Sequence, residues 1–314
     1  MNVFANTCFL LVLSAIGAFG ATDNGLMALL PSASNVISSI DVERARSSPF
    51  GRFVMARMNS EDLNFRAFVD ATGFDPRRDL QYMVFGISGS GDEHKRFALL
   101  LRGNFDQDRI QAAVQSRSTR AMSVDGIEIY LDNKNPNETG FAFPELGVAA
   151  IGDIASLREV ISNRANPSTL AARTQEFITL VSRENDAWFV SMSPPRFVAH
   201  ELQQDLTPSP IKTQMFQSVR ECSGGVQFGD NLRLSFDAVT RSEKDAASLA
   251  DVLRFFASSI EMQQSKDARA RILAPALSGM SLSTHGDTVH ASLELTEQNL
   301  EQLAQLGPRT QRAR

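Results

Sequence analysis

The stretch QYMVFGISGSGDEHKRFALLLRG, residues 81–103, decides the fold because it predicts a β-hairpin. Residues 81–88 and 96–103 are strand-like runs of apolar, β-branched and aromatic residues, and a glycine-rich, charged segment separates them. The next residues, DQDRIQAAVQ (106–115), have the apolar spacing of a helix, with Asp106 as N-cap. The local unit is therefore strand, turn, strand, helix.

The same unit recurs three more times along the chain. In the second copy, strands between 126 and 152 precede a helix capped by Asp153. In the third, 224–240 precedes a helix capped by Ser242, and in the fourth, 280–295 precedes a helix capped by Thr296. The first and third copies begin about 142 residues apart, and the second and fourth helices begin 143 apart. This near-constant offset indicates an internal duplication.

The predicted fold class is α+β, with two similar halves that each consist of an antiparallel sheet covered by helices. We expect the first half to span 21–167 and the second to span 168–306. A strand over 34–42 opens the first half, the helical stretch 168–184 joins the two, and a strand over 187–193 opens the second.

Two helices are expected between the first strand and the hairpin. Their apolar residues lie three or four positions apart over 50–58 and 63–69, and Ser60 is the expected N-cap of the second. Gly73 ends the second helix, and Pro76 makes its continuation unfavourable.

The glycine-rich segment 85–96 fits none of the catalytic or phosphate-binding loops that it superficially matches. A nucleophile elbow needs G-x-S-x-G before a helix, but Ser90 stands at the last glycine position and a strand follows. A dinucleotide loop also opens a helix, whereas Asp92, Glu93 and His94 follow Gly91 here. The segment is therefore predicted to be a flexible, charged hairpin loop.

Charge and composition exclude some partner classes. The chain of 314 residues has a net charge of -5, and its 36 acidic and 31 basic residues are spread along it. Such a chain has no basic field to attract nucleic acid. Three arginines lie in the last residues, 307–314, for which we expect a disordered basic tail.

The N-terminus has the pattern of a secretory leader. Residues 8–19, CFLLVLSAIGAF, are uncharged, and Ala18 and Gly20 supply the small residues that precede a cleavage site. The prediction is a signal peptide over 1–20 and export to the periplasm or the outside. No Lys or Arg precedes Arg44, so an uncleaved anchor or a buried helix stays an alternative. The apolar run is short for a membrane span, so none is expected after leader removal.

Loss of the leader removes Cys8 and leaves Cys222 as the single cysteine. No disulfide framework is then possible, and core burial must stabilise the fold. Cys222 is predicted to be a partly buried small apolar residue, with a reactive thiol as the alternative.

Two of the four histidines suggest a metal site. In THGDTVH a two-residue turn at Gly286–Asp287 would bring His285 and His290 to one side of a hairpin, together with Glu294. A site with two histidines and one carboxylate is conceivable there. A polar sheet face turned to water explains the same alternation, and no cofactor is predicted.

Phenylalanine is unusually common, with 21 residues against one Trp and two Tyr. Phe141 and Phe143 flank Ala142, while Phe255 and Phe256 lie within a helix. These four could line a cavity for an apolar ligand. Ordinary core packing is the alternative interpretation.

The residues LLP (29–31), DV (41–42), SPFG (48–51) and DPRRDL (75–80) resemble the opening of a family of uncharacterised secreted bacterial proteins. That resemblance implies export and a duplicated architecture, and it assigns no catalytic residue. The charge cluster of DPRRDL, Asp75, Arg77, Arg78 and Asp79, is interpreted as a solvated turn after a helix, with a functional loop as the alternative.

The sequence thus predicts an exported, non-enzymatic binding or structural protein of the bacterial cell envelope. Its partner would be an envelope protein or an apolar small molecule. A carrier of a lipid or other apolar ligand is one alternative. A hydrolase whose active-site residues come from distant positions is another.

Overall fold

The structure is a computed structural model that describes residues 22–57, 63–89, 96–115, 119–132, 139–193 and 218–306. The predicted leader and tail lie outside these ranges, as do Ser60, His94 and His200.

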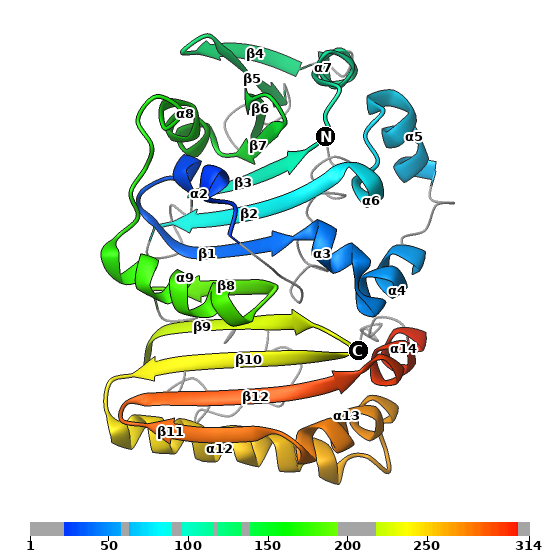
Figure 1. Ribbon diagram of the computed structural model, residues 1–314, viewed down its shortest axis with the longest axis vertical. Helices are drawn as coiled ribbons and strands as arrows, with labels where there is room; N and C mark the ends of the chain where they lie inside the picture. The colour runs from blue at the N-terminus through cyan, green and yellow to red at the C-terminus, as the bar shows by residue number, and fades with distance from the viewer. Residues whose placement is uncertain are drawn as a thin grey trace, which may run out of the picture.

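The described strands form one antiparallel sheet of 12 strands (Figure 1). Its order is β11-β12-β10-β9-β8-β1-β2-β3-β7-β6-β5-β4. The strands are β1 (Ser34–Asp41), β2 (Leu80–Ser88), β3 (Arg96–Gly103), β4 (Thr119–Val124), β5 (Ile127–Asp132), β6 (Gly140–Glu145), β7 (Val148–Gly152), β8 (Ala187–Ser191), β9 (Val219–Phe228), β10 (Asn231–Thr240), β11 (Ser281–His285) and β12 (Thr288–Thr296). The predicted α+β class with antiparallel strands is confirmed.

All four predicted units are present, and each ends in the predicted helix. The helices are α7 (Gln107–Gln115), α8 (Ile154–Ser162), α12 (Glu243–Met262) and α14 (Glu297–Gln305). Each predicted N-cap side chain accepts a hydrogen bond from a backbone N–H three residues later: Arg109 to Asp106, Ser156 to Asp153, Asp245 to Ser242 and Asn299 to Thr296. Local capping chemistry therefore fixed these starts.

The strand order supports the duplication. In the first half it runs β1-β2-β3-β7-β6, and in the second β8-β9-β10-β12-β11, so equivalent strands follow in the same order. The hairpin β4–β5 extends the first half alone. The two sheets are joined edge to edge, because β1 and β8 pair antiparallel from Val36–Ser191 to Ile40–Ala187. The exact division at residue 168 stays a prediction.

The remaining helices include some that the sequence reading did not predict. Before the first hairpin lie α2 (Asn24–Leu29), α3 (Val42–Ser47), α4 (Pro49–Arg57), α5 (Leu63–Thr72) and α6 (Pro76–Asp79). Later in the chain lie α9 (Ala172–Glu184) and α13 (Ala268–Ser278). The predicted end of α5 is confirmed, since Gly73 follows with a φ of 72°.

Both sides of the sheet carry helices. The α8 side is covered by α2, α8 and α9, which pack on β3, β6, β7, β8 and β9 (Figure 1). Its apolar core includes Leu26, Leu100, Leu157, Phe177 and Trp188. The α12 side is covered by α3, α7, α12, α13 and α14, whose residues pack in three further clusters. None of the described helices is both long and apolar enough to span a membrane.

Candidate functional site

One row of side chains crosses every strand of the sheet on the α8 side. Antiparallel partners point to the same side, so the register connects one residue of each strand to the next. From β11 to β4 the row reads Ser281, Ser292, Ser235, Gly225, Trp188, Ser39, Val84, Leu100, Ala150, Ala142, Ile129 and Met122. The row is polar at the β11 end and apolar from Val84 onward.

The change from polar to apolar residues along the row coincides with where helices pack on the α8 side of the sheet. In the first half, α8 follows β7 and buries Leu157 and Val160 against the apolar part of the sheet. In the second half, the corresponding helix α14 packs on the other side, where Leu300 meets Leu293 and Leu295. The helices that pack on β12 and β11, which are α12, α13 and α14, lie on the other side. On β10, Val239 belongs to the apolar core under α9, and the Ser235 hydroxyl donates to Asn185, the residue that follows α9. We call the polar residues on the α8 side of β10, β12 and β11 the open polar face. Its residues are Arg233, Ser235, Asp237, Ser281, Ser283, His285, Thr288, His290, Ser292 and Glu294.

The open polar face has a histidine–aspartate contact at its centre. His290 Nδ1 lies 2.8 Å from Asp237 Oδ1, and both side chains are partly exposed, 45% and 39%. If Nδ1 carries the proton, it donates to the carboxylate and Nε2 is left as an acceptor. The next strand places Ser283 directly opposite His290. Asp237, His290 and Ser283 thus follow one another on β10, β12 and β11.

The predicted metal ligands lie on this face but are not arranged as a metal site. His285 pairs with Thr288 and shares the side of His290, as the sequence predicted. Glu294, however, accepts two hydrogen bonds from Arg233, at 2.9 and 3.0 Å. Among the described residues, no group of three His, Cys, Asp or Glu side chains could hold a metal ion.

Sequence reasoning missed Asp237 and Arg233, the partners of His290 and Glu294. Both belong to β10, more than 50 positions earlier in the chain. The alternation of NLRLSFDAVT already indicated that Arg233, Ser235 and Asp237 share one side of a strand. Only the order of the strands shows that this side adjoins β12.

The four phenylalanines proposed as an apolar site do not come together. Phe141 and Phe143 contact each other edge to face, with ring centroids 4.8 Å apart, and Phe143 continues to Phe105 at 5.8 Å. They belong to the core under α7 in the first half. Phe255 and Phe256 lie on α12 in the second half, where Phe255 is 64% exposed.

Cys222 is a buried core residue, as predicted. Its side chain lies among Ala238, Ala246 and Val289, and it forms no disulfide. Burial raises the pKa of this thiol to about 12. At neutral pH the group is therefore a protonated, unreactive thiol.

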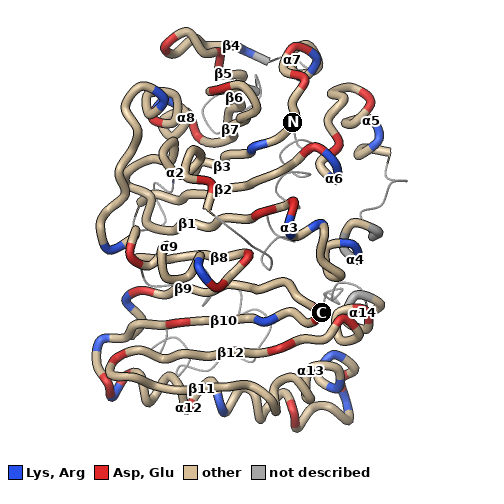
Figure 2. The backbone as a smooth tube through the Cα atoms, viewed as in Figure 1, with Lys and Arg blue, Asp and Glu red and all other residues tan. Residues whose placement is uncertain are grey.

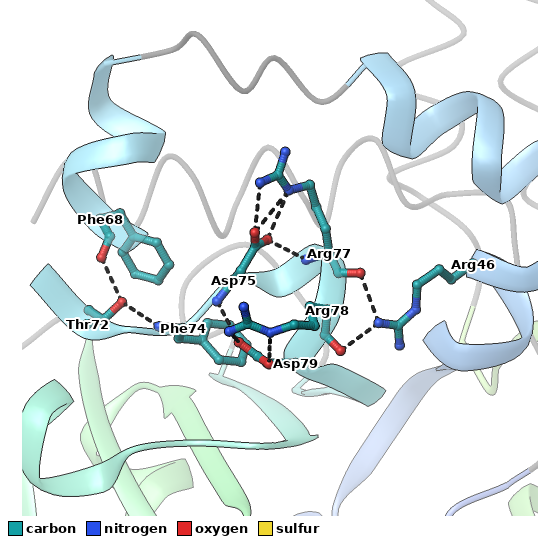
Figure 3. Close-up of polar contacts among 8 residues, drawn as sticks. All are labelled: Arg46, Phe68, Thr72, Phe74, Asp75, Arg77, Arg78 and Asp79. Carbon is teal, nitrogen blue, oxygen red and sulfur yellow. Dashed lines mark hydrogen bonds and ion pairs between the residues drawn. The ribbon is translucent and has the colours of Figure 1, made fainter. Parts of the chain in front are cut away.

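The charge cluster of DPRRDL is a self-contained hydrogen-bonded turn (Figure 3). Asp75 caps α6 through the N–H of Arg77 and also accepts from the Arg77 guanidinium, with Nη2 at 2.7 Å. Asp79 accepts from Arg78 at 2.7 Å and from the N–H of Asp75 at 2.8 Å. Arg46 of α3 donates to the carbonyls of Arg77 and Arg78. Each carboxylate of the cluster is therefore paired with a guanidinium of the same cluster, as expected of a structural turn.

The two carboxylates stabilise the fold in their charged forms. Hydrogen bonds from the neighbouring guanidiniums, Arg77 for Asp75 and Arg78 for Asp79, lower the pKa of each carboxyl below its usual value. A lowered folded-state pKa means that this stabilisation is present above the unfolded value, about 3.9. It is lost as the pH falls through the folded pKa.

Replacement of Asp79 should therefore destabilise the protein in a pH-dependent way. We expect Asp79→Ala to lower the free energy of unfolding by about 1–3 kcal/mol at pH 7, because the N–H of Asp75 loses its acceptor. Arg78 is 70% exposed, so its ion pair adds little to this loss. Urea unfolding at pH 7 and at pH 3 should show the difference from the unmodified protein shrinking in acid. Asp108→Ala, at an exposed position of α7, is the control. An equal loss at both pH values would contradict this role.

Solved structures of TP0453, a Treponema protein, are similar to this chain. Crystal form III has a TM-score of 0.54 at 10% identity, and the match covers 89% of this chain and 96% of that one. Crystal form IV has a TM-score of 0.51 at 11% identity, with 88% and 95% covered. No family model matches the chain, and no curated protein matches its sequence. At this identity the likeness shows a shared fold over most of the chain.

Proposed function

We propose that this chain is an exported, non-enzymatic binding protein of the bacterial cell envelope, and that it binds a polar protein surface through the open polar face. The observation that carries the proposal is the row of side chains across the sheet. From Val84 to Met122 the row is apolar and belongs to the core under α8 and α2, whereas Ser235, Ser292 and Ser281 at its other end are polar, and the helices that pack on β12 and β11 lie on the opposite side of the sheet. Export rests on the predicted leader.

The charges of the open polar face suit a polar partner. Arg233 and Glu294 are 60% and 53% exposed and carry opposite charges, and Asp237 and His290 add a second hydrogen-bonded pair. Serines fill the positions between them. Interfaces of non-obligate complexes have this mixed, hydrogen-bonding character. Elsewhere, basic and acidic residues are interspersed over both halves (Figure 2), so neither sign of charge dominates a surface that would attract an oppositely charged partner.

Site-directed photocrosslinking tests this proposal. A photoreactive phenylalanine analogue at Ser292 lies on the open polar face, and the same analogue at Ala247 lies on exposed α12. With an envelope fraction, we expect one discrete protein adduct from position 292 and none from position 247. Equal adducts from both positions, or none from position 292, would contradict binding through this face.

A hydrolase is the second candidate, because Asp237, His290 and Ser283 lie on neighbouring strands in the order of a catalytic triad. Such a site also needs hydrogen-bond donors for a developing oxyanion. The backbone amides beside Asp237 and His290 belong to the ladders of β10 and β12. Those beside Ser283 lie in the plane of the sheet at its edge, and Ser283 itself lies on an open surface. These points favour binding over catalysis.

We accordingly expect the protein to hydrolyse p-nitrophenyl acetate no faster than its His290→Ala variant does. The measurement is initial rate against enzyme concentration, with circular dichroism to show that the variant is folded. A rate that rises with protein concentration, and that both His290→Ala and Ser283→Ala abolish, would establish an enzyme and overturn the proposal.

A carrier of an apolar molecule has weaker support. Phe141 and Phe143 pack against other phenylalanines, and Phe255 and Phe256 belong to a different part of the molecule. Extraction of the purified protein with organic solvent, followed by mass spectrometry, tests this alternative. A stoichiometric apolar molecule would favour the carrier.

A further inference from the structure

The two end strands of the sheet, β11 and β4, differ in how they are protected. An end strand exposes unpaired backbone N–H and C=O groups, and natural proteins discourage pairing there with charges, prolines or bulges. The β4 edge carries Arg120, whose side chain is exposed. The five residues of β11, SLSTH, contain no proline, lysine, arginine or carboxylate, and β11 pairs with β12 without a register shift. The β11 edge is therefore open to another strand.

The hairpin geometry shows which backbone groups of β11 point outward. His285 and Thr288 flank the two-residue turn Gly286–Asp287, and such a turn is closed by a hydrogen-bonded pair. Hydrogen-bonded and non-hydrogen-bonded pairs alternate along an antiparallel ladder. Ser283 and Ser281 consequently bond to β12. The N–H and C=O groups of Leu282 and Thr284 point away from the sheet.

These outward groups match a second copy of the same strand. If β11 of two molecules pair antiparallel about a two-fold axis at Ser283, Leu282 of one copy faces Thr284 of the other, twice. Those residues carry the outward groups, so the register can form four backbone hydrogen bonds. Ser283 faces itself, and Ser281 lies opposite His285. No like charges meet, and all three polar positions stay on the open polar face.

We propose that the chain forms a two-fold dimer through β11, which joins two sheets edge to edge. The chain already contains this kind of junction, since β1 and β8 pair antiparallel across the two halves over five residues. The dimer brings two open polar faces together into one continuous surface. The inference concerns assembly and stands independently of the proposed partner binding.

Sedimentation velocity over a range of protein concentrations tests the dimer, with charge variants on the two-fold axis. For the unmodified protein, the molar mass obtained from sedimentation should be twice that of the monomer. Ser283→Lys and Ser283→Glu should each be monomeric, because like charges directly opposite each other destabilise a strand pair. An equimolar mixture of the two variants should restore a dimer. Ser283 is exposed, so both monomers should keep their fold.

A matched pair of proline variants separates the two end strands. Thr284→Pro removes an outward N–H of β11 and should abolish the dimer. Ser123→Pro is the control on β4, because Ser123 also precedes the last residue before a two-residue turn and should leave the dimer intact. A monomer at every concentration for the unmodified protein would overturn the proposal. If Ser283→Lys and Ser283→Glu each still form a dimer on their own, the proposal is overturned as well.

Discussion

Replacement of Trp188 by alanine is expected to lower the free energy of unfolding by about 3–5 kcal/mol. Trp188 is fully buried and is the largest of the fully buried side chains. It lies in β8, with Ser39 of β1 on one side and Gly225 of β9 on the other. The indole therefore fills the space where the two halves of the sheet meet. Its removal leaves a cavity that rigid strands on both sides cannot close.

Chemical unfolding followed by far-ultraviolet circular dichroism measures this effect, since the variant lacks the only tryptophan of the chain. Trp188→Phe keeps most of the apolar volume, so it should cost less than Trp188→Ala. Leu180→Ala is the matched control, because Leu180 lies on α9 above the same strands and is 59% exposed. We expect this control to cost well under 1 kcal/mol. If Trp188→Ala lowers the free energy of unfolding as little as Leu180→Ala does, contacts other than those of Trp188 stabilise the junction.

An ion pair also bridges the two halves at this junction. Arg44 of α3 donates to Asp186 at 2.6 Å, and Asp186 accepts from the N–H of Phe228 at 2.7 Å. Arg44 is 62% exposed, so the Coulomb attraction is weak, whereas the buried carboxylate satisfies a backbone amide. The apolar contact of Trp188 is consequently the larger contribution.

The sequence predicted the local units well because each depends on neighbouring residues. Asp106, Asp153, Ser242 and Thr296 all cap helices where the pattern placed them. Elements without a clear local signal were missed. The six residues of β4, TRAMSV, alternate only weakly between polar and apolar side chains. The helix α13 contains Pro275, and a proline ordinarily interrupts a helix.

The pairing that joins the two halves of the sheet could not be predicted from the sequence of either half alone. Pairing of β1 with β8 connects segments about 150 residues apart, and alternation in each strand says nothing about its neighbour. The same limit applies to the open polar face. His285, His290 and Glu294 were placed correctly on one side of a hairpin, but their real neighbours on β10 depend on the strand order.

The SPFG segment, residues 48–51, is the basis of the second prediction with a large expected effect, because each of its residues has a structural role. The Ser48 hydroxyl donates to the carbonyl of Ala45 at 2.7 Å and accepts from the N–H of Gly51 at 2.9 Å. Pro49 begins α4, where its fixed φ suits a first helical turn. Phe50 stacks on Phe228 of the second half with ring centroids 5.9 Å apart.

Gly51→Ala should destabilise the protein by at least about 2 kcal/mol, because an added methyl group has no room. A Cβ at this position would overlap the carbonyl oxygen of Ala45 and lie 2.9 Å from the Cα of Arg46, and both are backbone atoms that cannot rotate away. Either α3 or α4 must move, which would also disturb the contact of Phe50 with Phe228. Urea unfolding measures the loss, and Gly229→Ala is the control, since the nearest atom to its added Cβ is 3.5 Å away. If Gly51→Ala and Gly229→Ala cost the same, α3 and α4 are not in the close contact that this interpretation of SPFG requires.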